Sequence, residues 1–325
     1  MKKRIAYLIL AATLLAVLGH MLWTGSASQK IVYATGQSGN DSVCSGNTRF
    51  AVIGDFGEEG PEEEAVANLV EGWQPDFIAT VGDNNYPDGK AATIDANIGQ
   101  YYSDYIYPYV GSYGSVATEN RFFPALGNHD WDGNDIQPHL DYFTLPGNER
   151  YYDVRRGPVH LFIVDSEPEE PDGNKANSIQ AQWLAAQMAA SNAPWKLVMM
   201  HRAPYSSGSR HGSSESLQWD YVAMGATAVF SGHEHLYERL ERDGILYFVN
   251  GLGGRPAIYD FGTPIEGSIV RYNQDHGAML ITAGETCINF SFYNRAGENG
   301  ERIDSHTVVR PSSTSYLYLP LLFGR

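Results

Sequence analysis

The sequence has little of what marks a nucleic-acid-binding or a disulfide-rich protein. It holds only two cysteines in 325 residues, and neither lies in a metal-binding cysteine spacing. Acidic residues outnumber basic ones by 38 to 22, the net charge is −16, and no stretch is rich in lysine or arginine. We therefore expect no nucleic-acid partner and no polyanion bound over a wide surface.

Repeats and a dinucleotide-binding glycine motif are also missing. No internal repeat is visible, and Gly251–Gly254 lacks the G-x-G-x-x-G spacing, so this segment predicts a tight turn. The hydrophobic fraction of 43% and the aromatic fraction of 12% are typical of a globular protein. The length is sufficient for one large α/β domain or for two domains.

The N-terminal segment predicts export. Basic residues 2–4 precede an apolar run from Ile5 to about Trp23, and residues 25–27 (Gly-Ser-Ala) follow as a small-x-small pattern. The run is long for a signal peptide and nearly long enough to span a bilayer. Residues 1–27 are therefore either a cleaved signal peptide or a retained membrane anchor. In both cases we expect the body to be secreted, periplasmic or on the outer surface, attached to a membrane only through this segment.

The remainder divides into three parts. Residues 28–48 are polar and predict a linker or arm, and residues 49–310 form the predicted domain. Residues 311–325 are a short apolar tail, too short to span a membrane, that either docks onto the body or acts as a sorting signal. Cys44 and Cys287 either form a disulfide between the arm and a late strand or remain separate buried thiols.

Local patterns predict helices first and mainly strands later. Pro61, followed by acidic residues 62–64, predicts a helix start with its acids in solvent. A second helix is predicted over Asn177–Ala190, and four apolar residues share one of its faces: Ile179, Trp183, Leu184 and Met188. From Gly244 onward four strands are predicted: Ile245–Asn250, Ser268–Tyr272, Ala278–Ala283 and Thr286–Tyr293.

Five short blocks, each following a strand-like apolar run, carry side chains that bind metals. The blocks are Gly54–Gly57 (Gly-Asp-Phe-Gly), Gly82–Tyr86 (Gly-Asp-Asn-Asn-Tyr), Gly127–Asp130 (Gly-Asn-His-Asp), Val198–His201 (Val-Met-Met-His) and Gly232–His235 (Gly-His-Glu-His). The runs before them include Phe77–Val81 and Phe122–Leu126. Groups at the carboxyl ends of strands in an open α/β sheet can meet in one crevice. The set therefore predicts a two-metal hydrolase.

The side chains of the blocks suit two different ions. A hard, highly charged ion prefers oxygen ligands, and the blocks offer Asp55, Asp83 and Tyr86. A borderline divalent ion suits imidazole with a neutral amide, which His201, His233 and Asn128 offer. Asp83 is central among the blocks and is the predicted bridge between ions about 3.5–4 Å apart. His233 and His235 point the same way on extended backbone and can serve neighbouring ions.

Each block taken alone has a plainer interpretation. Gly54–Gly57 alone is a strand-to-loop turn, Tyr86 alone is a packed surface tyrosine, and His201 alone is a core histidine. The metal interpretation depends on the five blocks occurring together.

Together the five blocks resemble those of the calcineurin-like metallophosphoesterase superfamily. Tyr86, placed three residues after Asp83, is similar to purple acid phosphatases in particular, above all the small mammalian type. The resemblance covers about residues 49–293. It implies an α/β fold in which a two-sheet β-sandwich is flanked by helices, in four layers.

The resemblance also implies which residues hold two metal ions. The first ion, ferric iron in that family, would be held by Asp55, Asp83, Tyr86 and His235. The second, a divalent iron, zinc or manganese, would be held by Asp83, Asn128, His201 and His233. Each of these positions carries the residue type that the family uses.

Two more histidines are predicted to act on protons and phosphate. His129 adjoins Asn128, and Asp130 is expected to orient it. His211 lies in the loop after His201, where mammalian-type purple acid phosphatases are similar in placing a histidine; its plainer interpretation is an exposed loop residue. A protonated His129 or His211 would stabilise the phosphate and protonate the leaving alkoxide. For Arg202 and Arg210, a surface position is expected ahead of a phosphate contact.

The expected function is that of an exported, metal-dependent phosphomonoesterase of the acid phosphatase type. A metal-bound hydroxide would attack a small phosphate ester in line at the dinuclear centre. One alternative is a phosphodiesterase or nucleotidase on the same scaffold, because metal ligands do not encode the leaving group. The other is a metal- or phosphate-binding surface protein with little turnover.

Overall fold

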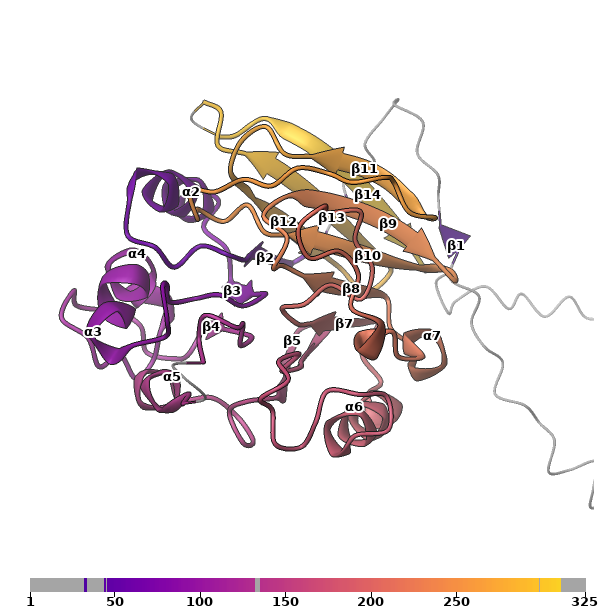
Figure 1. The fold of residues 1–325 in the computed structure, drawn as a ribbon, viewed down its shortest axis with the longest axis horizontal. Coiled ribbons are helices and arrows are strands. Elements are labelled where there is room, and N and C mark those ends of the chain that lie inside the picture. The colour runs from indigo at the N-terminus through magenta and orange to yellow at the C-terminus, as the bar shows by residue number, and fades with distance from the viewer. Residues whose placement is uncertain (1–31, 34–43, 45, 132–134, 298, 311–325) are drawn as a thin grey trace, which may run out of the picture. The chain divides into compact units, whose positions relative to one another are not determined.

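The structure, a computed structural model, describes residues 32–33, 44, 46–131, 135–297 and 299–310 (Figure 1). The predicted leader and tail, and most of the predicted arm, lie outside these residues. The chain divides into two units, residues 1–32 and 33–325, and every element from β2 onward belongs to the second. Among the helices that are described, none combines the length and the apolar character needed to cross a membrane.

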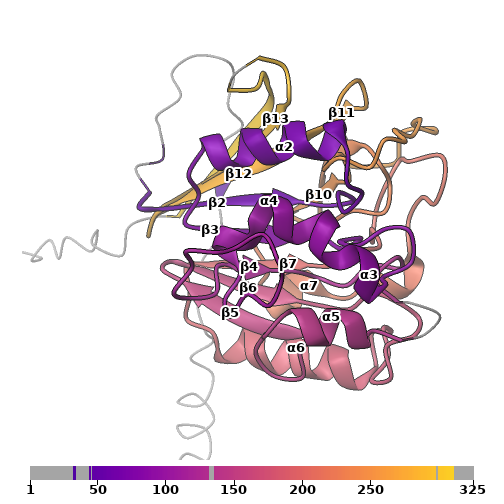
Figure 2. The ribbon, with the colours of Figure 1, turned by 90° about the vertical axis from the view of Figure 1, so that its left-hand side faces the viewer.

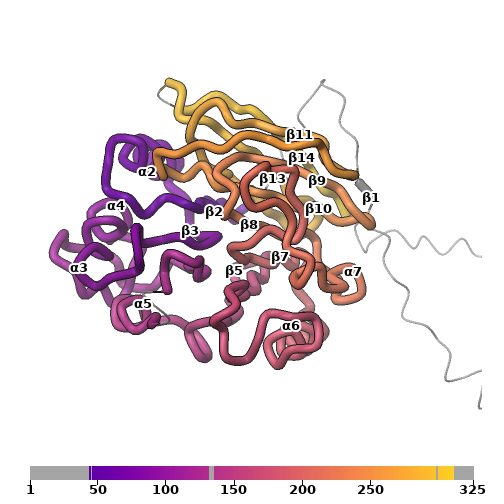
Figure 3. Tube along the Cα trace, viewed as in Figure 1, coloured from indigo at the N-terminus to yellow at the C-terminus, as the bar shows by residue number. Residues whose placement is uncertain are grey.

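Two β-sheets form the centre of the second unit (Figure 1). The first sheet includes, in spatial order, β14 (Arg302–Val309), β13 (Cys287–Asn294), β12 (Gly277–Ala283), β2 (Thr48–Ile53), β3 (Phe77–Thr80) and β4 (Phe122–Phe123). Strands β2, β3 and β4 run parallel, whereas β12 is antiparallel to β2. Figure 3 shows that β2 and β12 lie side by side although they are near opposite ends of the described chain. The short β1 (Val32–Tyr33) precedes them in sequence.

The second sheet has seven strands around a parallel centre. Their order is β11 (Ser268–Tyr272), β9 (Tyr237–Arg242), β10 (Ile245–Asn250), β8 (Ala228–Ser231), β7 (Trp195–Met199), β6 (Val159–Ile163) and β5 (Tyr152–Arg156). Strands β6, β7, β8 and β10 are parallel to one another. Every residue of β8 and β10 is buried, as expected for parallel strands covered on both faces.

Aromatic side chains fill the space between the two sheets. The ring of Phe290 on β13 lies 5.9 Å from that of Phe230 on β8 and 5.2 Å from that of Phe248 on β10. Their strand neighbours Val229 and Tyr247 point instead into the core under the helices, which is the alternation of a β-strand. Full burial of one such aromatic side chain contributes about 1.5–3 kcal/mol, so this layer is a main source of stability.

Helices cover the outer faces of both sheets. Helix α2 (Pro61–Gly72) packs on β12, and α6 (Ile179–Ala190) and α7 (Tyr221–Met224) cover the second sheet (Figure 2). Short helical segments connect β3, β4 and β5: α3 (Ala91–Ile94), η1 (Asp95–Gly99), α4 (Gln100–Tyr102), η2 (Ser103–Tyr105) and α5 (Gln137–Tyr142). A further short turn is η3 (Glu215–Leu217). The predicted two-sheet sandwich flanked by helices is confirmed.

Several predicted element boundaries were wrong by one to three residues, and two of them have clear local reasons. Helix α6 begins at Ile179 rather than Asn177, because the Ser178 hydroxyl accepts a hydrogen bond from the Ala181 N–H and caps the helix. Strand β4 ends at Phe123 rather than Leu126, since Pro124 has no N–H to donate to a sheet.

One residue of the predicted apolar face of α6 is not buried. Ile179 is 62% exposed, whereas Leu184 and Met188 are buried as predicted. Gln180 turns inward instead, because its side-chain amide bonds the backbone N–H and C=O of Asp165 at 2.7 and 2.8 Å.

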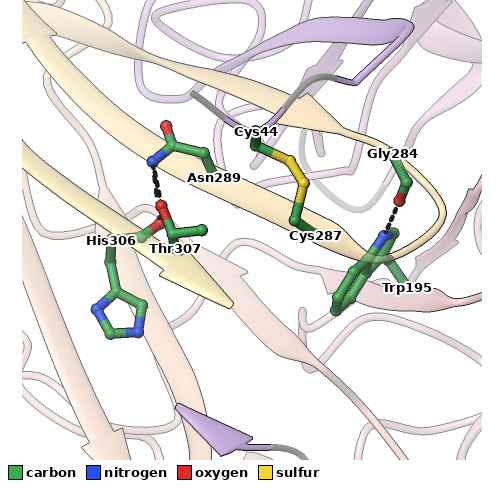
Figure 4. The surroundings of a disulfide bond; sticks show 7 residues. All are labelled: Cys44, Trp195, Gly284, Cys287, Asn289, His306 and Thr307. Atoms are coloured by element: carbon green, nitrogen blue, oxygen red, sulfur yellow. Dashed lines mark hydrogen bonds between the residues drawn. A yellow bond between two sulfur atoms is a disulfide. The ribbon is translucent and has the colours of Figure 1, made fainter. Parts of the chain in front are cut away.

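Cys44 and Cys287 form a disulfide (Figure 4), which resolves the alternative that the sequence left open. The Cα–Cα distance is 5.8 Å, and the bond ties the segment before β2 to the start of β13. Nearby, the Trp195 indole N–H donates to the Gly284 carbonyl at 2.6 Å and links β7 of the second sheet to the turn after β12 (Figure 4). Disulfides such as Cys44–Cys287 persist in oxidising compartments.

The first turn of α2 contains a carboxyl group that the sequence placed in solvent. Glu63 is fully buried, and neither of its carboxyl oxygens has a hydrogen-bond partner within the described part of the chain. The backbone of Gly254, at φ 142°, packs directly against the Glu63 Cα. Burial, reinforced by Glu59, raises the pKa of Glu63 well above its ordinary value.

This burial predicts a pH-dependent stability. The folded state holds the Glu63 proton more tightly than the unfolded chain does. This difference adds to the free energy of unfolding in acid, and the added stability is lost as pH rises. We expect the neutral variant Glu63→Gln to gain at least about 1 kcal/mol over the wild type between pH 4 and pH 8, measured by denaturant unfolding. A difference between the two proteins that stays constant over this pH range would contradict the assignment.

Candidate metal centre

All seven predicted metal ligands lie in loops that follow strands, and Tyr86 shares the loop after β3 with Asp83. Asp55, Asp83 and Asn128 follow the parallel strands β2, β3 and β4 of the first sheet. His201 follows β7 of the second sheet, and His233 and His235 follow β8. Ligand sites in α/β sheets form at the carboxyl ends of strands, and here both sheets contribute to one site.

Three of the predicted ligands converge on the hydroxyl of a fourth, Tyr86. The Tyr86 oxygen is 2.8 Å from Asp83 Oδ2, 3.5 Å from Asp55 Oδ1 and 3.4 Å from His235 Nε2. His235 Nε2 is in turn 3.4 Å from Asp55 Oδ1. These side chains are the ones that the resemblance assigns to the first ion.

The other predicted ligands converge on His201 Nε2. This nitrogen is 3.3 Å from Asp83 Oδ1, 3.2 Å from Asn128 Oδ1 and 3.1 Å from His233 Nδ1. Ligand atoms of Asp83, His201 and His233 all lie within 4.8 Å of one another. These are the side chains assigned to the second ion.

The Asp83 carboxylate belongs to both groups. Its Oδ2 faces Tyr86, and its Oδ1 faces His201, so one oxygen serves each group. This arrangement is the one that a bridging carboxylate requires.

Two of the histidine rings are held in position by backbone carbonyls. His201 Nδ1 lies 2.8 Å from the Val81 oxygen, and His235 Nδ1 lies 2.6 Å from the Ala257 oxygen. A donor at Nδ1 leaves the lone pair on Nε2, which is the atom that faces the other ligands in both residues.

The backbone around the ligands adopts conformations that bring the loops close together. Asp55, Asp83 and His233 have φ values of 54°, 54° and 68°, in the sparsely populated left-handed region. A Cβ at Gly127 would overlap the Asp83 carboxylate, so only glycine allows this approach. Strained backbone of this kind is typical of functional sites.

The electrostatics of the site favour a bound cation. Asp55 and Asp83 are at most 1% exposed. Burial acts to raise the pKa of Asp83, but charge and hydrogen bonds from His201 and His129 hold it below its usual range. Burial acts to lower the pKa of His201, yet Asp83 raises it to about 10.

The Tyr86 hydroxyl also favours a bound cation. Burial, together with the Asp83 and Asp55 carboxylates, raises the pKa of its hydroxyl well above the ordinary value. A nearby cation would reverse that shift and favour the phenolate. Three oxygen donors and an imidazole around one point fit a hard ion, and imidazoles with an amide and a carboxylate fit a borderline one.

His129 lies at the edge of the first group, and Asp130 acts on the backbone of its loop. The His129 ring centre is 4.5 Å from that of Tyr86, and its Nδ1 bonds the Pro87 carbonyl. The Asp130 carboxylate instead accepts from the N–H groups of Gly127 and Asn84, at 2.8 and 3.1 Å. Asp130 therefore fixes the loop that carries Asn128 and His129, and burial with the nearby Asp83 charge raises its pKa to about 7.

His211 and the two nearby arginines border the second group. The His211 ring stacks on that of His233 at 3.9 Å, and partial burial with Arg210 and Arg202 lowers its pKa. Arg202 is not a free surface residue: its Nε donates to Glu167 at 2.7 Å, and its Nη1 lies 3.1 Å from His233 Nε2. Arg210 is exposed, as predicted, with its guanidinium 4.6 Å from the ring centre of Tyr259.

Two residues that lie beside the site were not predicted from the sequence. The Tyr259 ring stacks on that of His235 at 4.0 Å, and the Arg255 guanidinium lies 4.6 Å from the ring centre of Tyr86 and pairs with Glu58. Both lie in the loop after β10, which carries no motif. Only the fold brings that loop over the ligands.

Comparison with known proteins defines the class first. The family model for calcineurin-like phosphoesterases matches residues 48–237, and the chain belongs to this family. The match includes the seven predicted metal ligands. The predicted superfamily and the enzyme class of metallophosphoesterase are confirmed.

Individual relatives point to purple acid phosphatases. Purple acid phosphatase 17 of Arabidopsis thaliana is 25% identical over 288 residues, which cover 78% of this chain and 82% of the relative. Tartrate-resistant acid phosphatase type 5 of Homo sapiens is 25% identical over 242 residues, which cover 63% of this chain and 72% of the relative.

Solved structures show the same fold. Purple acid phosphatase PPD1 from yellow lupin superposes with a TM-score of 0.66 at 18% identity, over 82% of this chain and 54% of that chain. This chain therefore spans about half of the lupin protein. GAP50, the anchor in the inner membrane complex of Plasmodium, superposes with a TM-score of 0.60 at 18% identity, over 82% of this chain and 90% of that chain.

The shared Asp83 carboxylate predicts a change in metal stoichiometry. We expect Asp83→Asn to bind fewer metal ions per chain than the wild type, because both groups lose a charged oxygen ligand. His129→Ala is the control and should keep the wild-type content, since its ring is not among the seven predicted ligands. Metal content is measured by inorganic mass spectrometry after reconstitution, and an unchanged stoichiometry in Asp83→Asn would refute the bridging role.

Proposed function

We propose that this protein is an exported phosphomonoesterase of the acid phosphatase type, acting on a small phosphate ester at a dinuclear metal centre. The observation that carries the proposal is the Asp83 carboxylate, which presents one oxygen to each of two ligand groups. In-line displacement at phosphorus is the reaction that a pair of ions spaced by such a bridge serves.

The two groups differ in chemistry, and the proposed ions differ with them. Ferric iron is proposed for the group around Tyr86, and divalent iron, zinc or manganese for the group around His201. When bound, such ions polarise phosphoryl oxygens and bring water to ionisation near neutral pH or below.

The protein's own residues provide donors on two sides of the centre. His129 lies beside Tyr86, and His211 lies beside His233. With its Nδ1 bonded to the Pro87 carbonyl, His129 keeps Nε2 as the atom that can deliver a proton to the leaving alkoxide. His211 is the proposed second donor.

Arg202 is the proposed anchor for the phosphate oxygens. Its guanidinium is held by the buried Glu167 carboxylate, so its remaining N–H groups are oriented in advance. A local cation of this kind is needed because the net charge of −16 repels an anionic substrate.

The proposal of export rests on two features. The Cys44–Cys287 disulfide is of a kind that persists outside the cytoplasm. The leader pattern of residues 1–27, which lies outside the described residues, points the same way.

The leaving-group specificity gives a direct test. We expect the metal-replete protein to hydrolyse a phosphomonoester such as 4-nitrophenyl phosphate faster than its bis(4-nitrophenyl) diester. We expect His129→Ala to lower kcat about 100-fold, as loss of a proton donor does, while metal content stays unchanged. Faster hydrolysis of the diester would favour the phosphodiesterase alternative, and no hydrolysis by metal-replete protein would favour a binding protein.

A further inference from the structure

The loop that carries His211 is fastened to the metal centre by a carboxyl group between two metal ligands. Glu234 lies between His233 and His235 in sequence and is fully buried. Its Oε1 accepts hydrogen bonds from the backbone N–H of His211 at 2.5 Å and of Gly212 at 2.6 Å. Both bonds hold the tip of the segment Ser206–Gly212, named here the His211 loop.

The His211 loop fits closely around the Glu234 side chain. A Cβ at Gly208 would overlap the Glu234 carboxyl group, so the loop backbone passes directly over it. The contact is therefore a close fit between loop and carboxyl group as well as two hydrogen bonds.

A second buried glutamate holds the base of the same loop. Glu238 accepts from the Ser207 N–H at 2.7 Å and from the Ser207 hydroxyl at 2.6 Å, and also from the Ser268 hydroxyl at 2.6 Å. The base is thus fixed independently of Glu234. Ser209 is held as well, because its hydroxyl donates to the Asp260 carbonyl at 2.8 Å. Loss of the Glu234 contacts should therefore release His211 and Gly212 while the base and Ser209 stay in place.

The position of the tip decides where His211 lies. The His211 residue is exposed, yet its ring stacks on that of the predicted ligand His233 at 3.9 Å. An exposed loop side chain gains little from the stack alone, because ordering it costs conformational entropy. The two hydrogen bonds that Glu234 accepts fix the backbone from which the ring projects.

We propose that Glu234 is the residue that positions His211 over the metal centre, through the reach of its acceptor oxygen. One oxygen, Oε1, receives both backbone bonds, whereas Oε2 has no partner within the described residues. The role therefore depends on an acceptor at the right distance rather than on a second charged oxygen. The inference rests on the proposed function only in assigning His211 to the reaction.

Two substitutions at Glu234 separate reach from charge. Glu234→Gln keeps the acceptor in place and removes the charge, whereas Glu234→Asp keeps the charge and shortens the side chain by one carbon. We expect Gln to retain kcat/KM for the monoester within about threefold, and Asp to lose about 10- to 100-fold, since a displacement of about 1 Å costs that much in catalysis. The opposite order would show that Glu234 acts by charge and would overturn the proposal.

A double-mutant cycle tests whether the effect passes through His211. His211→Ala should lower kcat/KM by the same factor in the wild type and in Glu234→Gln. In Glu234→Asp the same substitution should lower kcat/KM less than about threefold. Glu241→Gln, further along β9, is the control that should leave both kcat/KM and the cost of His211→Ala unchanged. An equal cost of His211→Ala in wild type and Glu234→Asp would refute positioning through His211.

Amide hydrogen exchange on the full chain provides a readout that needs no activity. Exchange at residues 210–212 should accelerate in Glu234→Asp and remain as in the wild type in Glu234→Gln, with β8 and β10 protected in both. Native exchange at 210–212 in the Asp variant, or loss of bound metal from it, would overturn the proposal. If the wild type has no phosphatase activity, the exchange data still decide whether Glu234 holds the loop, so the two failures are distinguishable.

Discussion

The Asp83 carboxylate, buried between two sets of ligands, is the constraint on which the rest of the site depends. Its two oxygens face Tyr86 and His201, and the surrounding residues either complete one of the two groups or hold a ligand ring in position. A carboxylate at most 1% exposed is costly to keep charged, and in this structure the charge is offset by histidines and by donated N–H groups. The raised pKa of the Tyr86 hydroxyl shows the same need for positive charge at this point.

The two sheets are arranged so that this constraint can be met. Parallel strands of both sheets end at the same place, so ligands far apart in the sequence come together there. The Phe230, Phe248 and Phe290 rings fix the spacing of the sheets, and a left-handed backbone at Asp55, Asp83 and His233 turns their side chains toward one another. Two residues outside the predicted ligand set, Asp130 and Glu234, each hold a loop by accepting hydrogen bonds from backbone N–H groups.

The sequence was informative where metal-binding side chains directly follow a predicted strand. The ligand blocks stand out because metal-binding side chains follow apolar runs, and strands Ile245–Asn250 and Ser268–Tyr272 were predicted to the residue. Burial set by distant partners was not predictable: Gln180 faces inward because it bonds Asp165, and Glu63 is buried under a loop that comes almost 200 residues later. Tyr259 and Arg255 carry no motif, and the disulfide remained an alternative until the fold brought Cys44 and Cys287 together. Glu234 had one available signal, its place between two ligand histidines.

The fold alone does not set the function, since the yellow lupin purple acid phosphatase and the Plasmodium anchor GAP50 both share it. In this chain the predicted ligands surround two points, with Tyr86 at one of them and His201 at the other. The most direct test is the visible spectrum of the purified, iron-reconstituted protein beside that of Tyr86→Phe, with metal content measured on both. The account predicts a broad visible band in the wild type that is lost in Tyr86→Phe while iron stays bound. A metal-replete wild type without the band, or a band that survives in Tyr86→Phe, would contradict it.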